Sequence, residues 1–198
     1  PKLVISDSDF LKTLSKREII CGYGEILKHS LIKSKVFYRF LDKNVSKVLK
    51  LKSPYIEKAI YQSCKIKKSV VEKDEKENKF RKTLNFGHTF AHAYEASLGF
   101  SKRLNHGEAV ILGIFSALNF SYEKNLLDNL EYNLIINHLK NSRLPFKLKN
   151  YFSLNKLDKI VLFMTKDKKN YSEKINLILL KKIGHPIINR EFKKDDLK

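Results

Sequence analysis

The chain has 198 residues, 42% of them apolar and 11% aromatic, a composition that fits a folded globular protein and excludes a disordered one. Its net charge of +19 raises the possibility of nucleic-acid binding, but its lysines and arginines are spread along the chain rather than gathered into a patch. No apolar run approaches the roughly 20 residues of a transmembrane helix, and no signal-peptide pattern opens the chain. We therefore expect a cytoplasmic protein with no membrane partner.

The first 14 residues differ from the rest. Residues 3–6 read as a short strand, and the sequence DFLKTL that follows predicts a short helical turn. A lone strand cannot satisfy its backbone hydrogen bonds, and the chain begins with Pro1 rather than methionine. We therefore expect residues 1–14 to be the last strand and linker of a missing N-terminal domain, and residues 15–198 to form one further domain.

That second domain is predicted to be mainly helical. Ser15 and Glu18 form a capping box that opens a helix to about residue 33, and Ser53 with Pro54 marks another helix start. Between them we expect two short helices, near residues 36–41 and 45–51. Further helices are expected at about 81–98, from 106 onward, near 130–141 and near 156–166. Two strands around a turn at residues 184–186 complete a mainly α fold with a C-terminal β-hairpin.

A stripe of polar residues is the most informative feature. Placed on one helix, Arg81, Asn85, His88, His92 and Glu95 fall on a single face. In a chain so rich in lysine, residues 83–123 contain only two basic residues, at positions 102 and 103. The stripe therefore indicates a metal or anion site, although two histidines four residues apart also occur on solvated faces and in cores.

A carboxylate elsewhere in the chain could complete such a site. Glu25 shares a helix face with Lys28 and His29, and the ordinary interpretation is a surface ion pair. One glutamate and two histidines would leave a zinc-type ion with open positions, as catalytic sites require. The sequence by itself does not establish that these groups meet.

Five stretches, in order, resemble 3-dehydroquinate synthase: DFLKTL, GYGEILKHSLI, SCKIKKSVVEKDEKE, RKTLNFGHTFAHAYE with NHGEAV, and DKK followed by INLILLKKIG. The chain is similar to the C-terminal helical domain of that family, whose NAD-binding N-terminal domain is missing here. The resemblance implies zinc or cobalt ligands at Glu25, His88 and His106. It implies substrate contacts by Lys28, Lys67 and Asn85, phosphate contacts by Arg81, His92 and Lys168, and NAD contacts by Phe10, Leu11, Lys12 and Thr13.

The implied enzyme is a lyase of the shikimate pathway of aromatic amino acid biosynthesis. In that family, 3-deoxy-D-arabino-heptulosonate 7-phosphate becomes 3-dehydroquinate and phosphate, with transient oxidation by NAD beside the metal. The resemblance implies a homodimer and a sugar-acid phosphate substrate, and we expect the isolated chain to be inactive. A sibling cyclase acting on sedoheptulose 7-phosphate and a non-catalytic basic nucleic-acid-binding module are the alternatives.

This sequence also departs from the family pattern. His29 stands where tyrosine is usual, and Gly24 stands where alanine is common. Ala91 and Tyr94 replace a frequent glycine and isoleucine, and the loop before His106 is about two residues longer than in some relatives. None of these departures removes an expected metal ligand, but Tyr94 and the loop are expected to alter the shape of the pocket.

Overall fold

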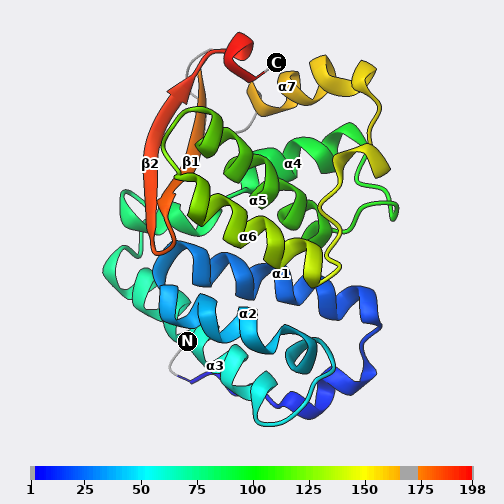
Figure 1. Ribbon diagram of the computed structural model, residues 1–198, viewed down its shortest axis with the longest axis vertical. Coiled ribbons are helices and arrows are strands. Elements are labelled where there is room, and N and C mark those ends of the chain that lie inside the picture. Colours follow the sequence, from blue (N-terminus) through cyan, green and yellow to red (C-terminus); the bar gives the residue numbers. More distant parts are fainter. Residues whose placement is uncertain (1–2, 166–173, 198) are drawn as a thin grey trace.

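The computed structural model describes residues 3–165 and 174–197 (Figure 1). The helices are stacked from α3 through α2, α1 and α5 towards α7, and the β-hairpin runs along one side of the stack. The helices are α1 (Lys16–Lys33), α2 (Lys35–Leu49), α3 (Tyr55–Lys73), α4 (His88–Ser97), α5 (His106–Glu123), α6 (Asn129–Asn141) and α7 (Leu157–Thr165). The strands are β1 (Ile175–Lys182) and β2 (His185–Phe192). The predicted mainly helical fold with a C-terminal hairpin is confirmed.

Local signals set several helix boundaries. The backbone N–H of Ser15 donates to Glu18 at 2.7 Å while that of Glu18 donates to the Ser15 hydroxyl at 3.3 Å, so the predicted capping box opens α1. The prediction of two short helices within 36–51 is wrong, because α2 is continuous from its cap at Ser34. No proline or glycine interrupts this segment, and the Asn44 amide donates to the Phe40 carbonyl within the helix.

Helix α5 is the centre of the packing. Its residues Ala109 to Leu112 and Ile114 are fully buried, and the helix contacts α1, α4, α6 and β1. A helix that is apolar on most sides lies inside a protein, as its sequence predicted. Because α1 and α4 both pack against α5, side chains from these three helices can meet at one place.

The hairpin is fastened to the helices by hydrogen bonds. The turn passes through Gly184 at φ +88°, and its N–H donates to the Leu31 carbonyl of α1 at 2.7 Å. The N–H of Ile183 donates to Glu131 of α6 at 2.9 Å, and the N–H of Leu180 donates to the Ser121 hydroxyl of α5 at 3.0 Å. The two strands therefore close one side of the helical stack.

The predicted N-terminal strand is not formed. Within the described chain, residues 3–6 are assigned no strand, and Leu3, Val4 and Ile5 are 74%, 72% and 82% exposed. Strand pairing needs a partner, and none lies against this segment in the part of the chain that the structure describes. The predicted turn follows at Ser8–Thr13 as a 3-10 helix. The assignment of residues 1–14 to a preceding domain stays a prediction.

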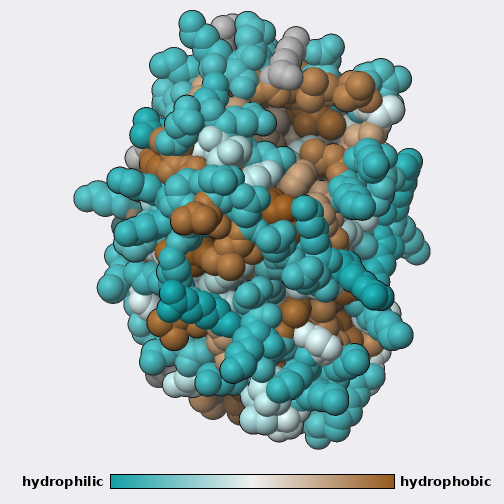
Figure 2. Space-filling view, in the orientation of Figure 1, coloured by the Kyte–Doolittle hydropathy of each residue, from teal (hydrophilic) through white to brown (hydrophobic). Residues whose placement is uncertain are grey.

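The face of the molecule shown in Figure 2 is largely hydrophilic, with separate hydrophobic patches between the charged side chains. One of these patches lies at the end of the molecule where Figure 1 places α7. Among the described residues, no helix is both long and apolar enough to cross a membrane.

Candidate metal centre

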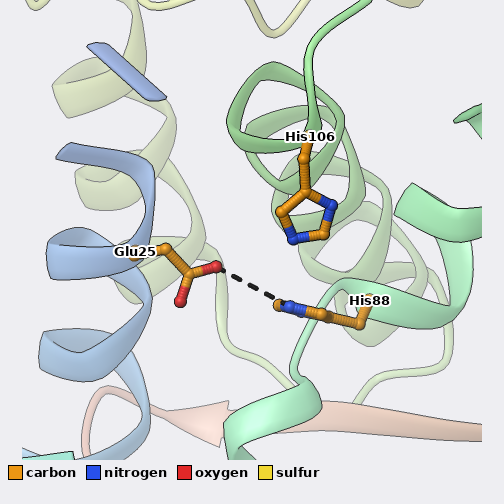
Figure 3. A group of neighbouring side chains, drawn as sticks. All are labelled: Glu25, His88 and His106. Carbon is orange, nitrogen blue, oxygen red and sulfur yellow. Dashed lines mark ion pairs between the residues drawn. The ribbon is translucent and has the colours of Figure 1, made fainter. Parts of the chain in front are cut away.

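Three helices each contribute one potential metal ligand to a single place. Glu25 lies in α1, while His88 and His106 are the first residues of α4 and α5 (Figure 3). One ligand atom from each residue lies within 4.8 Å of the others, and the Oε1 of Glu25 is 3.7 Å from the Nε2 of His88. The three ligands predicted from the resemblance are thus brought together.

Close contact between helices α1 and α5 positions two of these residues. A Cβ at Gly107 would lie 2.4 Å from the Cα of Cys21, and a Cβ at Gly24 would lie 3.2 Å from the Gly107 carbonyl oxygen. The backbones of α1 and α5 therefore touch where each lacks a side chain. Because Gly24 precedes Glu25 and Gly107 follows His106, this contact places the carboxylate and the imidazole on facing turns.

A second pair of glycines positions His88. Gly87 adopts φ +80°, and a Cβ at Gly113 would lie 2.1 Å from the Gly87 carbonyl oxygen. The left-handed backbone at Gly87 ends the preceding 3-10 helix (Phe80–Asn85) and starts α4 at His88. The prediction of one continuous helix from about residue 81 is therefore wrong. Arg81 and Asn85 lie in the 3-10 helix that precedes α4, not on the same helix as His88.

Glu25 offers one carboxylate oxygen that could bind a cation. Its Oε2 accepts a hydrogen bond from the buried Lys28 ammonium at 2.6 Å. Its Oε1 is buried without a hydrogen-bond partner among the described residues, which normally costs about 1–3 kcal/mol. Burial raises the pKa of Glu25, but the charge and hydrogen bond of Lys28 outweigh burial and hold that pKa below its usual value. An ionised, half-satisfied carboxylate therefore faces His88.

Both histidines present a free ring nitrogen to the same place. Burial, reinforced by the charge of Lys28, lowers the pKa of His88 to about 3, so this imidazole is neutral near pH 7. Its Nδ1 lies 3.4 Å from the Phe86 carbonyl oxygen, and we assign the ring proton to that nitrogen. The Nδ1 of His106 lies 3.1 Å from Glu95. Two imidazole nitrogens and a carboxylate fit a zinc or cobalt ion with open positions.

The residues predicted to bind substrate surround this centre only in part. Lys28 is 3% exposed, and Lys67 is exposed on α3. Burial, with a smaller contribution from the charge of Lys67, lowers the pKa of Lys28 against the opposing effect of Glu25. His29 joins α1 to α3 through a 2.7 Å hydrogen bond between its Nδ1 and the hydroxyl of Ser63.

The structure describes Arg81 and His92, which were predicted to bind phosphate, and Asn85, which was predicted to bind other groups of the substrate. The Arg81 guanidinium donates to the carbonyl of Glu75, and the Asn85 amide donates to the Glu77 carboxylate at 2.6 Å. The exposed His92 ring lies 5.5 Å from that of His88, measured between centroids. Lys168 lies outside the described residues.

The predicted NAD contacts lie in the exposed 3-10 turn Ser8–Thr13, where the Phe10 side chain is 73% exposed and Leu11 is half-buried. Lys12 pairs with Asp9 at 2.7 Å, and the Thr13 hydroxyl donates to the Phe10 carbonyl at 2.8 Å. No described contact joins this turn to the metal ligands.

Sequence reasoning missed two contacts, those of Glu77 with Asn85 and of Glu95 with His106. Glu95 belonged to the predicted polar stripe, seven residues after His88, but no role followed from that position. Its contact depends on how α4 packs on α5, which the stripe does not encode.

The fold and the three residues Glu25, His88 and His106 define a helical domain with a candidate metal site. Residues 22–170 match the family model described as 3-dehydroquinate synthase C-terminal, so the chain belongs to that family. It is 57% identical over 192 residues to the 3-dehydroquinate synthase of Pelagibacter ubique, covering 97% of this chain and 52% of that protein. The Chlorobaculum tepidum synthase is 38% identical, covering 96% and 52%. The chain thus spans about half the length of these curated relatives.

Solved structures confirm the fold. The 2-epi-5-epi-valiolone synthase of Streptomyces hygroscopicus, with NAD⁺ and Zn²⁺ bound, matches with a TM-score of 0.82 and 19% identity, over 96% of this chain and 52% of that one. A 2-deoxy-scyllo-inosose synthase complexed with carbaglucose-6-phosphate, NAD⁺ and Co²⁺ matches with a TM-score of 0.80 and 22% identity, over 96% and 53%.

Proposed function

We propose that this chain is the metal- and substrate-binding part of a working 3-dehydroquinate synthase. The complete enzyme would convert 3-deoxy-D-arabino-heptulosonate 7-phosphate to 3-dehydroquinate and phosphate. The observation that carries the proposal is the convergence of Glu25, His88 and His106 in a chain that belongs to this family.

These three residues would hold a zinc or cobalt ion, which polarises a substrate oxygen as a Lewis acid. Glu25 supplies a negative charge that the ion would share with Lys28, and the neutral His88 supplies a nitrogen without prior loss of a proton. NAD supplies the hydride acceptor. It would be held mainly by a preceding domain, with Phe10, Leu11, Lys12 and Thr13 at the junction.

The rim of the centre would bind the rest of the substrate. Lys28, Lys67 and Asn85 would bind its hydroxyl and carboxylate groups. The Asn85 amide is oriented by the hydrogen bond that it donates to the Glu77 carboxylate.

The phosphate would be bound by Arg81, His92 and Lys168. A guanidinium binds phosphate oxygens as a planar fork, and fixed cationic groups lower the energy of charge that develops as phosphate leaves. The main task of these side chains is therefore to position the substrate and to stabilise charge.

A chimeric enzyme tests the proposal. The N-terminal portion of the Pelagibacter ubique relative would be joined to this chain, with His88→Ala and, as control, His185→Ala on the exposed start of β2. We expect phosphate release from 3-deoxy-D-arabino-heptulosonate 7-phosphate, lost in His88→Ala and kept in His185→Ala. Full activity of His88→Ala would overturn the metal assignment.

Turnover of sedoheptulose 7-phosphate in place of the seven-carbon acid phosphate would instead support a sibling cyclase. Size-exclusion chromatography with light scattering on the chimera tests the predicted homodimer.

A further inference from the structure

His106 is the least constrained of the three candidate ligands. Its side chain is 54% exposed, whereas that of His88 is 14% exposed. An exposed imidazole can rotate and can carry its proton on either nitrogen. Packing alone therefore does not fix which nitrogen of His106 faces Glu25 and His88.

Glu95 supplies the missing constraint. Both of its carboxylate oxygens lie near the Nδ1 of His106, at 3.2 Å and 3.1 Å, and the Glu95 side chain is only 12% exposed. A carboxylate without a proton can only accept hydrogen bonds, so Nδ1 carries the proton in this contact. The lone pair is then on Nε2, the nitrogen free to face the other two ligands.

The support for Glu95 is itself rigid. Glu95 follows His88 by seven residues on α4, so both lie on the same face of that helix. Gly87 and Gly113 hold α4 against α5 with no room for a Cβ between them. The distance from the Glu95 backbone to the start of α5 is therefore fixed by packing.

We propose that Glu95 is a positioning residue, which orients His106 and sets its tautomer for metal binding. This inference rests on the proposed metal centre and adds a residue to it. Carboxylates hydrogen-bonded to metal-binding histidines typically contribute 10- to 100-fold to metal affinity.

The same atoms allow one other arrangement. Ligand atoms of His92, Glu95 and His106 also lie within 4.8 Å of one another, so Glu95 could be a ligand itself. The geometry favours the positioning role, because the distances from Nδ1 to the carboxylate are hydrogen-bond lengths. The buried Oε1 of Glu25 also lacks a hydrogen-bond donor within the described part of the molecule.

Cobalt titration of the 198-residue chain tests the proposal. We compare Glu95→Ala and Glu95→Gln with Glu72→Gln, which changes an exposed glutamate of α3. We expect Co²⁺ affinity to fall about 10- to 100-fold in Glu95→Ala, to fall less in Glu95→Gln, and to stay unchanged in Glu72→Gln. The visible spectrum of saturated Glu95→Ala should match that of the unchanged chain, because the ligands are the same.

A second readout needs no metal. Nitrogen-15 NMR of the metal-free chain should show His106 with its proton on Nδ1, and Glu95→Gln should weaken that preference. Unfolding in urea with a chelator shows whether each variant is folded. If Glu95→Ala is not folded, Glu95→Gln is used for the test instead.

Unchanged cobalt affinity and an unchanged tautomer in a folded Glu95 variant would overturn the positioning role while leaving the metal centre intact. An altered cobalt spectrum would overturn it in favour of Glu95 as a ligand. The proposed metal centre itself fails only if His88→Ala binds cobalt as the unchanged chain does.

Discussion

Arg17 of α1 binds Glu108 of α5 through two parallel hydrogen bonds, from Nε to Oε1 at 2.7 Å and from Nη2 to Oε2 at 2.6 Å. The same guanidinium donates to the carbonyls of Lys102 and Arg103, and Glu108 accepts from the backbone N–H of Asn105. Arg17 therefore fastens the loop before His106 to the helix that carries Glu25.

Removing this ion pair should loosen the metal centre. We expect Arg17→Ala to lower the free energy of unfolding by about 2 kcal/mol, because it leaves the mostly buried Glu108 carboxylate without its main donor. Cobalt affinity should fall as well. The exposed pair of Lys68 and Glu72 provides the control, and Lys68→Ala should change stability by less than about 0.5 kcal/mol. Equal effects of the two substitutions in urea unfolding would contradict this.

Two glycines close in space should respond to alanine with opposite signs. Gly107→Ala places a methyl group against the Cα of Cys21 and should cost about 3 kcal/mol or more while weakening metal binding. Gly22→Ala meets nothing within 4 Å and should stabilise exposed helix by about 1 kcal/mol. Thermal or urea unfolding measures both. A tolerated Gly107→Ala would show that the backbones of α1 and α5 can separate without harm.

Tyr23 tests whether stability and metal binding are separable. Its hydroxyl lies 2.9 Å from the Nε2 of His138. The other ring nitrogen of His138, Nδ1, lies 2.8 Å from the Asp42 carboxylate. Tyr23→Phe leaves a buried nitrogen without this partner and should cost about 1–3 kcal/mol in unfolding free energy. Cobalt affinity should not change, because Tyr23 lies two residues before Glu25 and the two side chains therefore face different sides of α1. Exposed Tyr61→Phe is the control for the loss of a hydroxyl.

The buried His29 should make stability depend on pH. Burial lowers its pKa to about 4, so between pH 6.5 and 4 the unfolded chain binds a proton that the folded chain does not. The contribution of neutral His29 to the free energy of unfolding is therefore complete above pH 6.5 and is lost as the pH falls towards 4. Lowering the pH from 7 to 5 should cost about 2 kcal/mol through this group.

That loss should be absent from His29→Gln when urea unfolding is measured at both pH values with a chelator present. The contribution of His88 is common to both proteins and cancels in the difference. Exposed His185→Gln should keep the wild-type pH dependence. An identical pH dependence of His29→Gln and the unchanged chain would contradict the assignment.

Local chemistry made several features predictable from the sequence. The capping box at Ser15 and Glu18 and the apolar helix after His106 depend on residues within a few positions of one another. The metal-binding role of Glu25, His88 and His106 was predicted by resemblance, since periodicity left other interpretations of the histidines open. Their convergence within 4.8 Å agrees with that prediction.

Other features depend on contacts distant in sequence. The backbone at Gly87 turns left-handed where it meets Gly113 on another helix, so helical spacing wrongly joined Arg81 to His88. Glu95 gained a role only through its packing opposite His106. The strand expected at residues 3–6 needed a partner strand, and in the described chain β1 and β2 pair only with each other.

The most direct test of the metal centre is the zinc content of the purified chain after equilibrium dialysis, with His88→Ala and His185→Ala measured in parallel. The account predicts one zinc ion per chain, lost in His88→Ala and retained in His185→Ala, because His88 faces Glu25 whereas His185 lies on the exposed start of β2. Zinc retained by His88→Ala at the level of the unchanged chain would contradict it.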